Sequence, residues 1–165
     1  MKTLVICRHA KSDWEQDLSD FDRPLNARGL RDAPLMGAWL HQAGFKADRI
    51  ISSPANRAIS TAKIIAGEIG YAHPIQLEPG FYDSHHRTVL DLIHEVESSV
   101  NTLMIFGHNP TFENLGAILL ESHGGLILPT SGMICLEAFV HSWRELGAQS
   151  TQLKWFITPK TLGRD

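Results

Sequence analysis

Short apolar runs alternate with longer amphipathic stretches along the first 120 residues of this chain. A continuous apolar run bounded by turn residues is typical of a buried strand, and apolar residues recurring at three and four positions are typical of a helix. Strands are predicted at Leu4–Cys7, Arg49–Ser53 and Leu103–Phe106. Helices are predicted over 26–43, 58–70, 89–96 and 112–120. This alternation predicts parallel strands covered by helices.

The first predicted helix has recognisable ends. Asn26 is a suitable N-cap and Gly44 a suitable stop, while Pro34 inside the helix removes one backbone hydrogen bond and is expected to kink the first turns. Its predicted buried face consists of Leu30, Ala33, Met36, Gly37 and Leu40.

The last third of the chain has a different pattern. Met133–Val140 and Gln152–Thr158 are rich in β-forming residues and have no obvious crossover helix between them, so this pair is expected to be antiparallel. No repeat, low-complexity tract or linker interrupts the sequence. The prediction is therefore one domain, residues 1–165, with a three-layer α/β/α fold and a mostly parallel sheet containing an antiparallel strand.

Composition narrows the class of protein. With 43% hydrophobic and 20% charged residues, the 165-residue chain reads as globular, and no apolar run approaches the roughly 20 residues of a membrane span. The net charge is −3 and the basic residues are scattered, which argues against a nucleic-acid partner. Cys7 and Cys135 lie in apolar segments without metal-like spacing, so buried reduced thiols and a cytoplasmic location are expected.

Candidate catalytic residues lie just after three of the predicted strands. Arg8 and His9 follow the first strand, Arg57 lies one turn beyond the second, and His108 follows the third. Open α/β sheets bind ligands at the carboxyl ends of their strands, so these side chains are expected to converge. An imidazole can attack phosphorus while guanidinium groups hold phosphoryl oxygens.

These segments resemble the histidine phosphatase superfamily. The family carries an Arg-His-Gly-like motif, a Ser-Pro-x-x-Arg-x-x-x-Thr-Ala segment and a later Gly-His or Ser-His motif, matched here by Arg8–Ala10, Ser53–Ala62 and Gly107–Pro110. Ala10 in place of glycine is a departure. Further stretches, at 22–25, 108–110 and 156–160, resemble the small SixA-like phosphohistidine phosphatases. The resemblance spans nearly the whole chain and implies a phosphoglycerate mutase-like fold.

The resemblance also implies roles. His9 is the nucleophile, held as a neutral ring by a hydrogen bond from its other nitrogen to a backbone carbonyl. Arg8, Arg57 and His108 hold the phosphoryl group, with His108 more useful when protonated, and no metal or cofactor is required. Lys11 and Ser12 are candidates for secondary phosphate contacts.

A general acid is expected in the loop around residue 80. The candidates are Asp83 and, just before it, Glu78. A turn-forming role for Asp83 competes with the catalytic one.

Several functions stay open on the sequence alone. The substrate can be protein phosphohistidine or a small phosphorylated metabolite, and a phosphoglycerate mutase-type transfer is the nearest enzymatic rival. A phosphoanion-binding module and a metal site are the other classes. The metal site would use His9 and His108 with Asp83 and either His85 or His86, but the arginine charges would oppose a cation.

Overall fold

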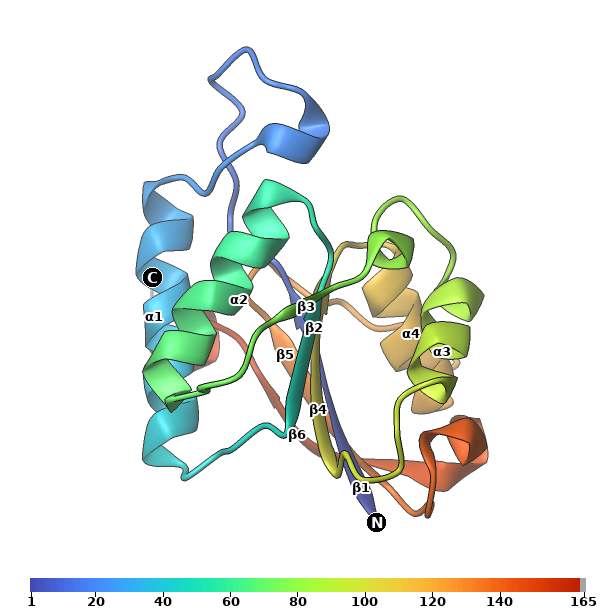
Figure 1. Ribbon diagram of the computed structural model, residues 1–165. Coiled ribbons are helices and arrows are strands. Elements are labelled where there is room, and N and C mark those ends of the chain that lie inside the picture. The colour runs from blue at the N-terminus through green and yellow to red at the C-terminus, as the bar shows by residue number, and fades with distance from the viewer. Residues whose placement is uncertain (164–165) are drawn as a thin grey trace.

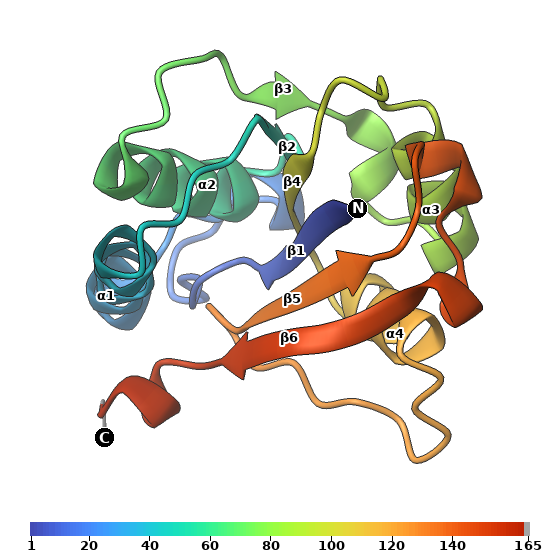
Figure 2. The same ribbon diagram turned by 90° about the horizontal axis from the view of Figure 1, so that it is seen from below.

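The protein is built around a six-stranded mixed sheet in strand order β3-β2-β4-β1-β5-β6. A computed structural model describes residues 1–163 (Figures 1 and 2). The strands are β1 Lys2–Arg8, β2 Arg49–Ser52, β3 Gln76–Leu77, β4 Thr102–Gly107, β5 Met133–Ala138 and β6 Thr151–Ile157. Neighbours among β1 to β4 are parallel, whereas β5 is antiparallel to both β1 and β6. The expected antiparallel final pair is confirmed.

Helices cover both faces of the sheet, as Figure 2 shows from below. Helices α1 (Ala27–Gln42) and α2 (Asn56–Ile69) lie on one face, and α3 (His86–His94) and α4 (Thr111–Leu119) on the other. The three-layer arrangement is the predicted one. The carboxyl ends of the four parallel strands lie at the same end of the sheet.

The two faces bury separate hydrophobic clusters. Leu4 and Ile6 of β1 join the cluster beneath α3 and α4, and Val5 and Cys7 join the cluster beneath α1 and α2. The alternation follows from the pleat of a strand that is covered on both sides. Cys7 and Cys135 are free, buried thiols, as expected.

Helix α1 has the predicted ends but a different buried face. The Asn26 side chain accepts a hydrogen bond from Gly29 N at 2.9 Å, and Gly44 has φ +71°. Leu30 is 56% exposed, which contradicts its assignment to the core. A Cβ on Gly29 would lie 2.2 Å from Lys11 O, so the segment after β1 packs directly on this glycine. Gly29, rather than Leu30, therefore faces this neighbouring segment.

Strand β3 was not predicted. Gln76 and Leu77 are both exposed, and this two-residue strand has no apolar run that would reveal it in the sequence. Strand β3 forms because it pairs with β2 at the sheet edge. Across residues 1–163, no helix is both long and apolar enough to span a bilayer.

Candidate active site

The ends of three adjacent parallel strands form the floor of the site. Strands β2, β4 and β1 are neighbours, and they end at the top of the sheet in Figure 1, beneath the loop that follows β1. His9 N donates to Gly107 O at 3.1 Å, and Ser53 N donates to Phe106 O at 2.9 Å. Main-chain hydrogen bonds thus continue past the strands and hold the three predicted motifs together.

His9 is buried and held in one tautomer. Its Nδ1 lies 2.7 Å from Ala10 O, and since a carbonyl oxygen only accepts, Nδ1 carries the proton. Nε2 then keeps its lone pair, toward which Arg57 Nε donates at 3.3 Å. Burial, helped by the nearby charges of the arginines, lowers the pKa of His9 to about 3. The ring is therefore neutral at pH 7, as expected for an attacking imidazole, and its role as the nucleophile stays a prediction.

Ala10 fits its position without the freedom of glycine. It is fully buried and is not among the residues with positive φ, so a methyl group there causes no backbone strain. Its N–H donates to Thr61 Oγ1 at 2.9 Å, and the same hydroxyl donates to Arg57 O at 2.7 Å. Thr61 therefore ties the turn after β1 to the first turns of α2.

Arg57 is paired with a carboxylate that sequence reasoning missed. Its Nη1 donates to the backbone oxygen of Asp20 at 2.6 Å and its Nη2 to Asp20 Oδ2 at 3.0 Å. Arg23, which is 5% exposed, donates to Asp20 Oδ1 at 2.9 Å, and Tyr82 Oη donates to Oδ2 at 2.8 Å. Partial burial acts to raise the pKa of Asp20, but hydrogen bonds from Tyr82 and the two arginines hold it well below its usual range.

His108 stands beside His9 in the same pocket. The two ring centroids are 5.2 Å apart, and His108 Nε2 is 2.8 Å from Ser53 Oγ. Burial, reinforced by the positive charges of Arg57 and Arg8, lowers the pKa of His108 to about 4. The ring is neutral at pH 7 in the free protein, and the expected benefit of a protonated His108 for holding a phosphoryl group stays a prediction. An oxyanion would offset the arginine charges and raise this pKa.

Three buried side-chain nitrogens in this site have no hydrogen-bond partner in the described part of the chain. They are Arg8 Nε, Arg23 Nε and His108 Nδ1. Arg8 Nη1 donates to Leu128 O at 3.1 Å, which fixes the guanidinium and leaves Nε unused. An unpaired buried donor costs about 1–3 kcal/mol, so such groups commonly belong to a ligand site.

The remaining predicted site residues lie at the margin. Lys11 is half-buried and lines an open hollow between its own loop and α1, and Ser12 Oγ accepts from Arg23 Nη1 at 2.5 Å. Asp83 is exposed with φ +49°, and Glu78 Oε1 accepts from Gly80 N at 3.0 Å. Glu78 thus has a capping role. Lys11 and Ser12 have no hydrogen bond to the His9 side chain, and the catalytic role of Asp83 stays a prediction.

The arrangement does not gather the ligands proposed for a metal site. The rings of His85 and His86 contact each other, with centroids 3.9 Å apart and planes tilted by 38°, and Asp83 is exposed. Within residues 1–163, no three His, Cys, Asp or Glu side chains lie close enough together to hold a metal ion.

Asp20, Arg23 and Tyr82 are the site residues that sequence reasoning did not assign. The segment 22–25 was noted for its family resemblance, so Arg23 lay within a recognised signal. Asp20 and Tyr82 carried none, because each reaches the site from a loop whose path is set by tertiary contacts.

Comparisons with known proteins agree with this geometry. A family model, the histidine phosphatase superfamily (branch 1), matches residues 4–109. An uncharacterized protein of Mycobacterium tuberculosis (strain ATCC 25618 / H37Rv) is 33% identical over 163 residues, covering 93% of this chain and 99% of that protein.

Two solved structures share the fold. The protein histidine phosphatase SixA complexed with tungstate superposes with a TM-score of 0.83 at 20% identity, covering 97% of this chain and 99% of SixA. A phosphoserine phosphatase mutant from Entamoeba histolytica in complex with phosphoserine has a TM-score of 0.69 at 18% identity, with 97% and 98% of the two chains covered.

Proposed function

Because this chain belongs to the histidine phosphatase superfamily (branch 1), we propose that it hydrolyses phosphohistidine on a protein substrate, through a phosphoryl group carried on His9. The observation that carries the proposal is the state of His9. Its ring is buried and neutral, its proton is fixed on Nδ1, and its Nε2 faces the Arg57 guanidinium. A neutral imidazole beside a phosphate-binding arginine is suited to attack phosphorus.

In the first step, His9 Nε2 forms a bond to phosphorus and the phosphorus–nitrogen bond of the substrate breaks. The departing imidazole takes the bonding electron pair and leaves as a neutral ring when its other nitrogen carries a proton. The new phosphohistidine has a positive ring, and Ala10 O, which accepts from Nδ1, stabilises that charge. Arg8, Arg57 and His108 stabilise the equatorial oxygens.

In the second step, water attacks phosphorus and the electron pair returns to His9 Nε2. The two hydrogens of water remain with the released dihydrogen phosphate, so the ring is restored to its neutral form. Both steps use donors already in place around His9, which limits the reorganisation required during reaction.

The protonation state of the acidic side chain at the site favours hydrolysis of phosphohistidine over hydrolysis of an alkyl phosphoester. Among the described residues, the carboxylate hydrogen-bonded to the phosphate-binding machinery is Asp20, whose pKa lies below its usual range. It is ionised near pH 7 and is a poor proton donor. A phosphohistidine leaving group brings its own proton, whereas an alkoxide needs one from a general acid. SixA, which shares this fold, forms a complex with tungstate, an oxyanion.

The test is to trap the intermediate. The protein is incubated briefly with radiolabelled phosphoramidate, quenched in alkali and digested, and the label is located by mass spectrometry. We expect an acid-labile, base-stable phosphate on His9. The His9→Ala protein should carry none, and His141→Ala, which changes an exposed histidine, should label like the wild type. Label that persists in His9→Ala would overturn the assignment of the nucleophile.

Substrate class is tested by comparing phosphohistidine-containing proteins with phosphoserine and phosphoglycerate as substrates. The proposal expects kcat/KM to be highest for the protein phosphohistidine, with inorganic phosphate as product. Preference for phosphoserine would favour a small-molecule phosphomonoesterase, and return of the label to phosphoglycerate would favour a mutase. Activity should survive a chelator, since the proposed steps use only side chains and water. We place this reaction in the cytoplasm.

A further inference from the structure

A second cavity lies at the opposite end of the sheet from His9. Its volume is about 270 Å³, and its lining includes Thr3 and Thr102, which pair with each other near the starts of β1 and β4. His9 and His108 follow the other ends of these two strands. The cavity is therefore separated from the proposed phosphatase site by the length of the strands.

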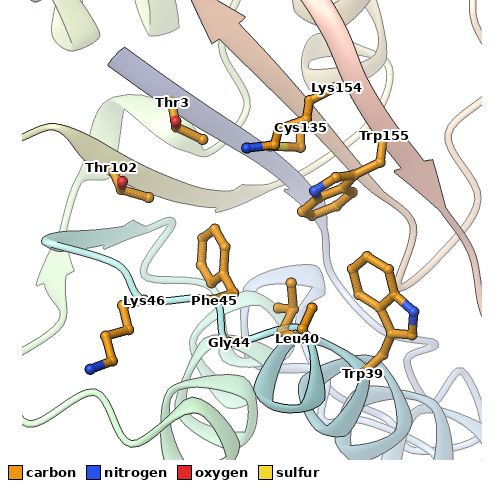
Figure 3. A pocket seen from close by; sticks show the side chains of 11 residues that line it. Thr3, Trp39, Leu40, Gly44, Phe45, Lys46, Thr102, Cys135, Lys154 and Trp155 are labelled. Atoms are coloured by element: carbon orange, nitrogen blue, oxygen red, sulfur yellow. The ribbon is translucent and has the colours of Figure 1, made fainter. Parts of the chain in front are cut away.

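Aromatic side chains form much of the cavity wall. Trp155 contacts Trp39 edge to face, with ring centroids 5.1 Å apart, and Phe45 lies 6.5 Å from Trp155 at 78°. All three rings are only partly buried, and Figure 3 shows them grouped between the end of α1 and β6. Buried interiors normally pack without such spaces. An open cavity walled by rings offers flat apolar surface to a ligand of one or two rings.

An irregularity in β6 adds a positive charge to this wall. Cys135 pairs with Trp155 and Leu136 pairs with Leu153, so Lys154 is an extra residue opposite no partner. Consecutive strand residues ordinarily point to opposite faces, yet Lys154 and Trp155 both line the cavity and project to the same side in Figure 3. Bulges of this kind re-aim side chains and recur next to binding sites.

The charged side chains that line the cavity indicate an anionic ligand. The lining contains Lys154 and Lys46 but no aspartate or glutamate, in a chain whose net charge is −3. Lys46 extends away from the rings in Figure 3, which leaves Lys154 as the cation beside them. Its ion pair with Glu137 is long, at 3.4 Å, and Lys154 is 51% exposed. A half-exposed pair of this kind is weak, so an incoming anion can compete with Glu137.

We propose that this cavity binds a small planar aromatic carboxylate, with the ring against Trp155 and Phe45 and the carboxylate on the Lys154 ammonium. The hydroxyl groups of Thr3 and Thr102 supply polar contacts on the sheet side of the cavity. The volume is below that of pockets for drug-sized molecules, which fits a ligand of one or two fused rings. The site is independent of the phosphatase chemistry at His9.

The probe is 2-naphthoate, with neutral 2-naphthamide as its matched control, and binding to the full-length protein is measured by isothermal titration calorimetry. We expect 2-naphthoate to bind at least tenfold more tightly than 2-naphthamide. Lys154→Gln should remove that preference while leaving 2-naphthamide affinity unchanged. Lys63→Gln, which changes an exposed lysine on α2, is the control and should behave like wild type.

Binding measured in saturating tungstate distinguishes the cavity at this end of the sheet from the proposed phosphatase site at the other end. The proposal expects 2-naphthoate affinity to stay the same with tungstate present and in the His9→Ala protein. Competition by tungstate would mean that the probe occupies the arginine site, and would overturn the proposal. So would equal affinity for the acid and the amide, equal affinity in Lys154→Gln, or no binding of 2-naphthoate at millimolar concentration.

Discussion

The Asp20 carboxylate accepts a hydrogen bond from Arg57, one of the side chains proposed to hold the phosphoryl group. It bonds to Arg57, Arg23 and Tyr82 while remaining half-exposed, so it offsets positive charge that a phosphoryl group would otherwise use. An oxyanion must compete with it.

We therefore predict that Asp20→Asn tightens tungstate binding roughly tenfold, or about 1.4 kcal/mol, the size of a hydrogen bond to a charged group. Asp22→Asn is the matched control, because Asp22 lies in the same short 3-10 helix and accepts from Ser19 instead. Calorimetric titration with tungstate measures both. Weaker binding in Asp20→Asn would mean that Asp20 positions Arg57 rather than competing for it.

Asp83 provides a second test at the residue scale. Its positive φ of +49° is a conformation that asparagine also adopts readily, so Asp83→Asn changes the acid while keeping the turn. If Asp83 is the general acid, this change should slow alkyl phosphomonoester hydrolysis by about 10²-fold or more and leave phosphohistidine hydrolysis nearly unchanged. Steady-state rates on both substrates decide the point. Equal losses on both would indicate a role in folding or binding.

At the scale of elements, Thr61 joins the end of β1 to helix α2. The hydroxyl is fully buried and serves both the Ala10 N–H and the Arg57 carbonyl. Thr61→Val keeps the shape but leaves the Ala10 N–H unpaired, which should lower the free energy of unfolding by about 1–3 kcal/mol. Urea denaturation measures the loss. Thr61→Ser should recover most of it, and Thr88→Val, on the exposed side of α3, should cost little.

At the scale of the whole molecule, stability should depend on pH through the buried histidines. The pKa values of His9 and His108 fall to about 3 and about 4 in the folded protein, while an unfolded histidine titrates near ~6.5. Between those values the unfolded chain binds more protons than the folded one. The stabilisation is fully present above pH 6.5 and is lost as pH falls through about 4 for His108 and about 3 for His9.

The expected change is a fall of about 4 kcal/mol in the free energy of unfolding between pH 7 and pH 5, with the two histidines contributing similarly. Urea denaturation at several pH values measures it. His108→Gln should remove about half of the dependence. An unchanged slope in that variant would mean that His108 is not neutral in the folded state.

Local sequence patterns predict the order of the helices and most strands, the three-layer class, and the four side chains placed at the strand ends. Each rests on local information. The apolar periodicity around Leu4–Cys7 and Leu103–Phe106 identifies strands, and the carboxyl ends of neighbouring parallel strands share one edge. The convergence of His9, Arg57 and His108 followed from that topology.

Contacts between segments distant in sequence fix which groups complete the site and in which charge state. Asp20 and Tyr82 meet Arg57 from loops distant in sequence, and no local pattern encodes such a meeting. Strand β3 and the contact of Gly29 with the segment after β1 likewise depend on neighbours across space. The neutral state of His108 depends on burial and on arginine charges, which exist only once the chain has folded around that ring.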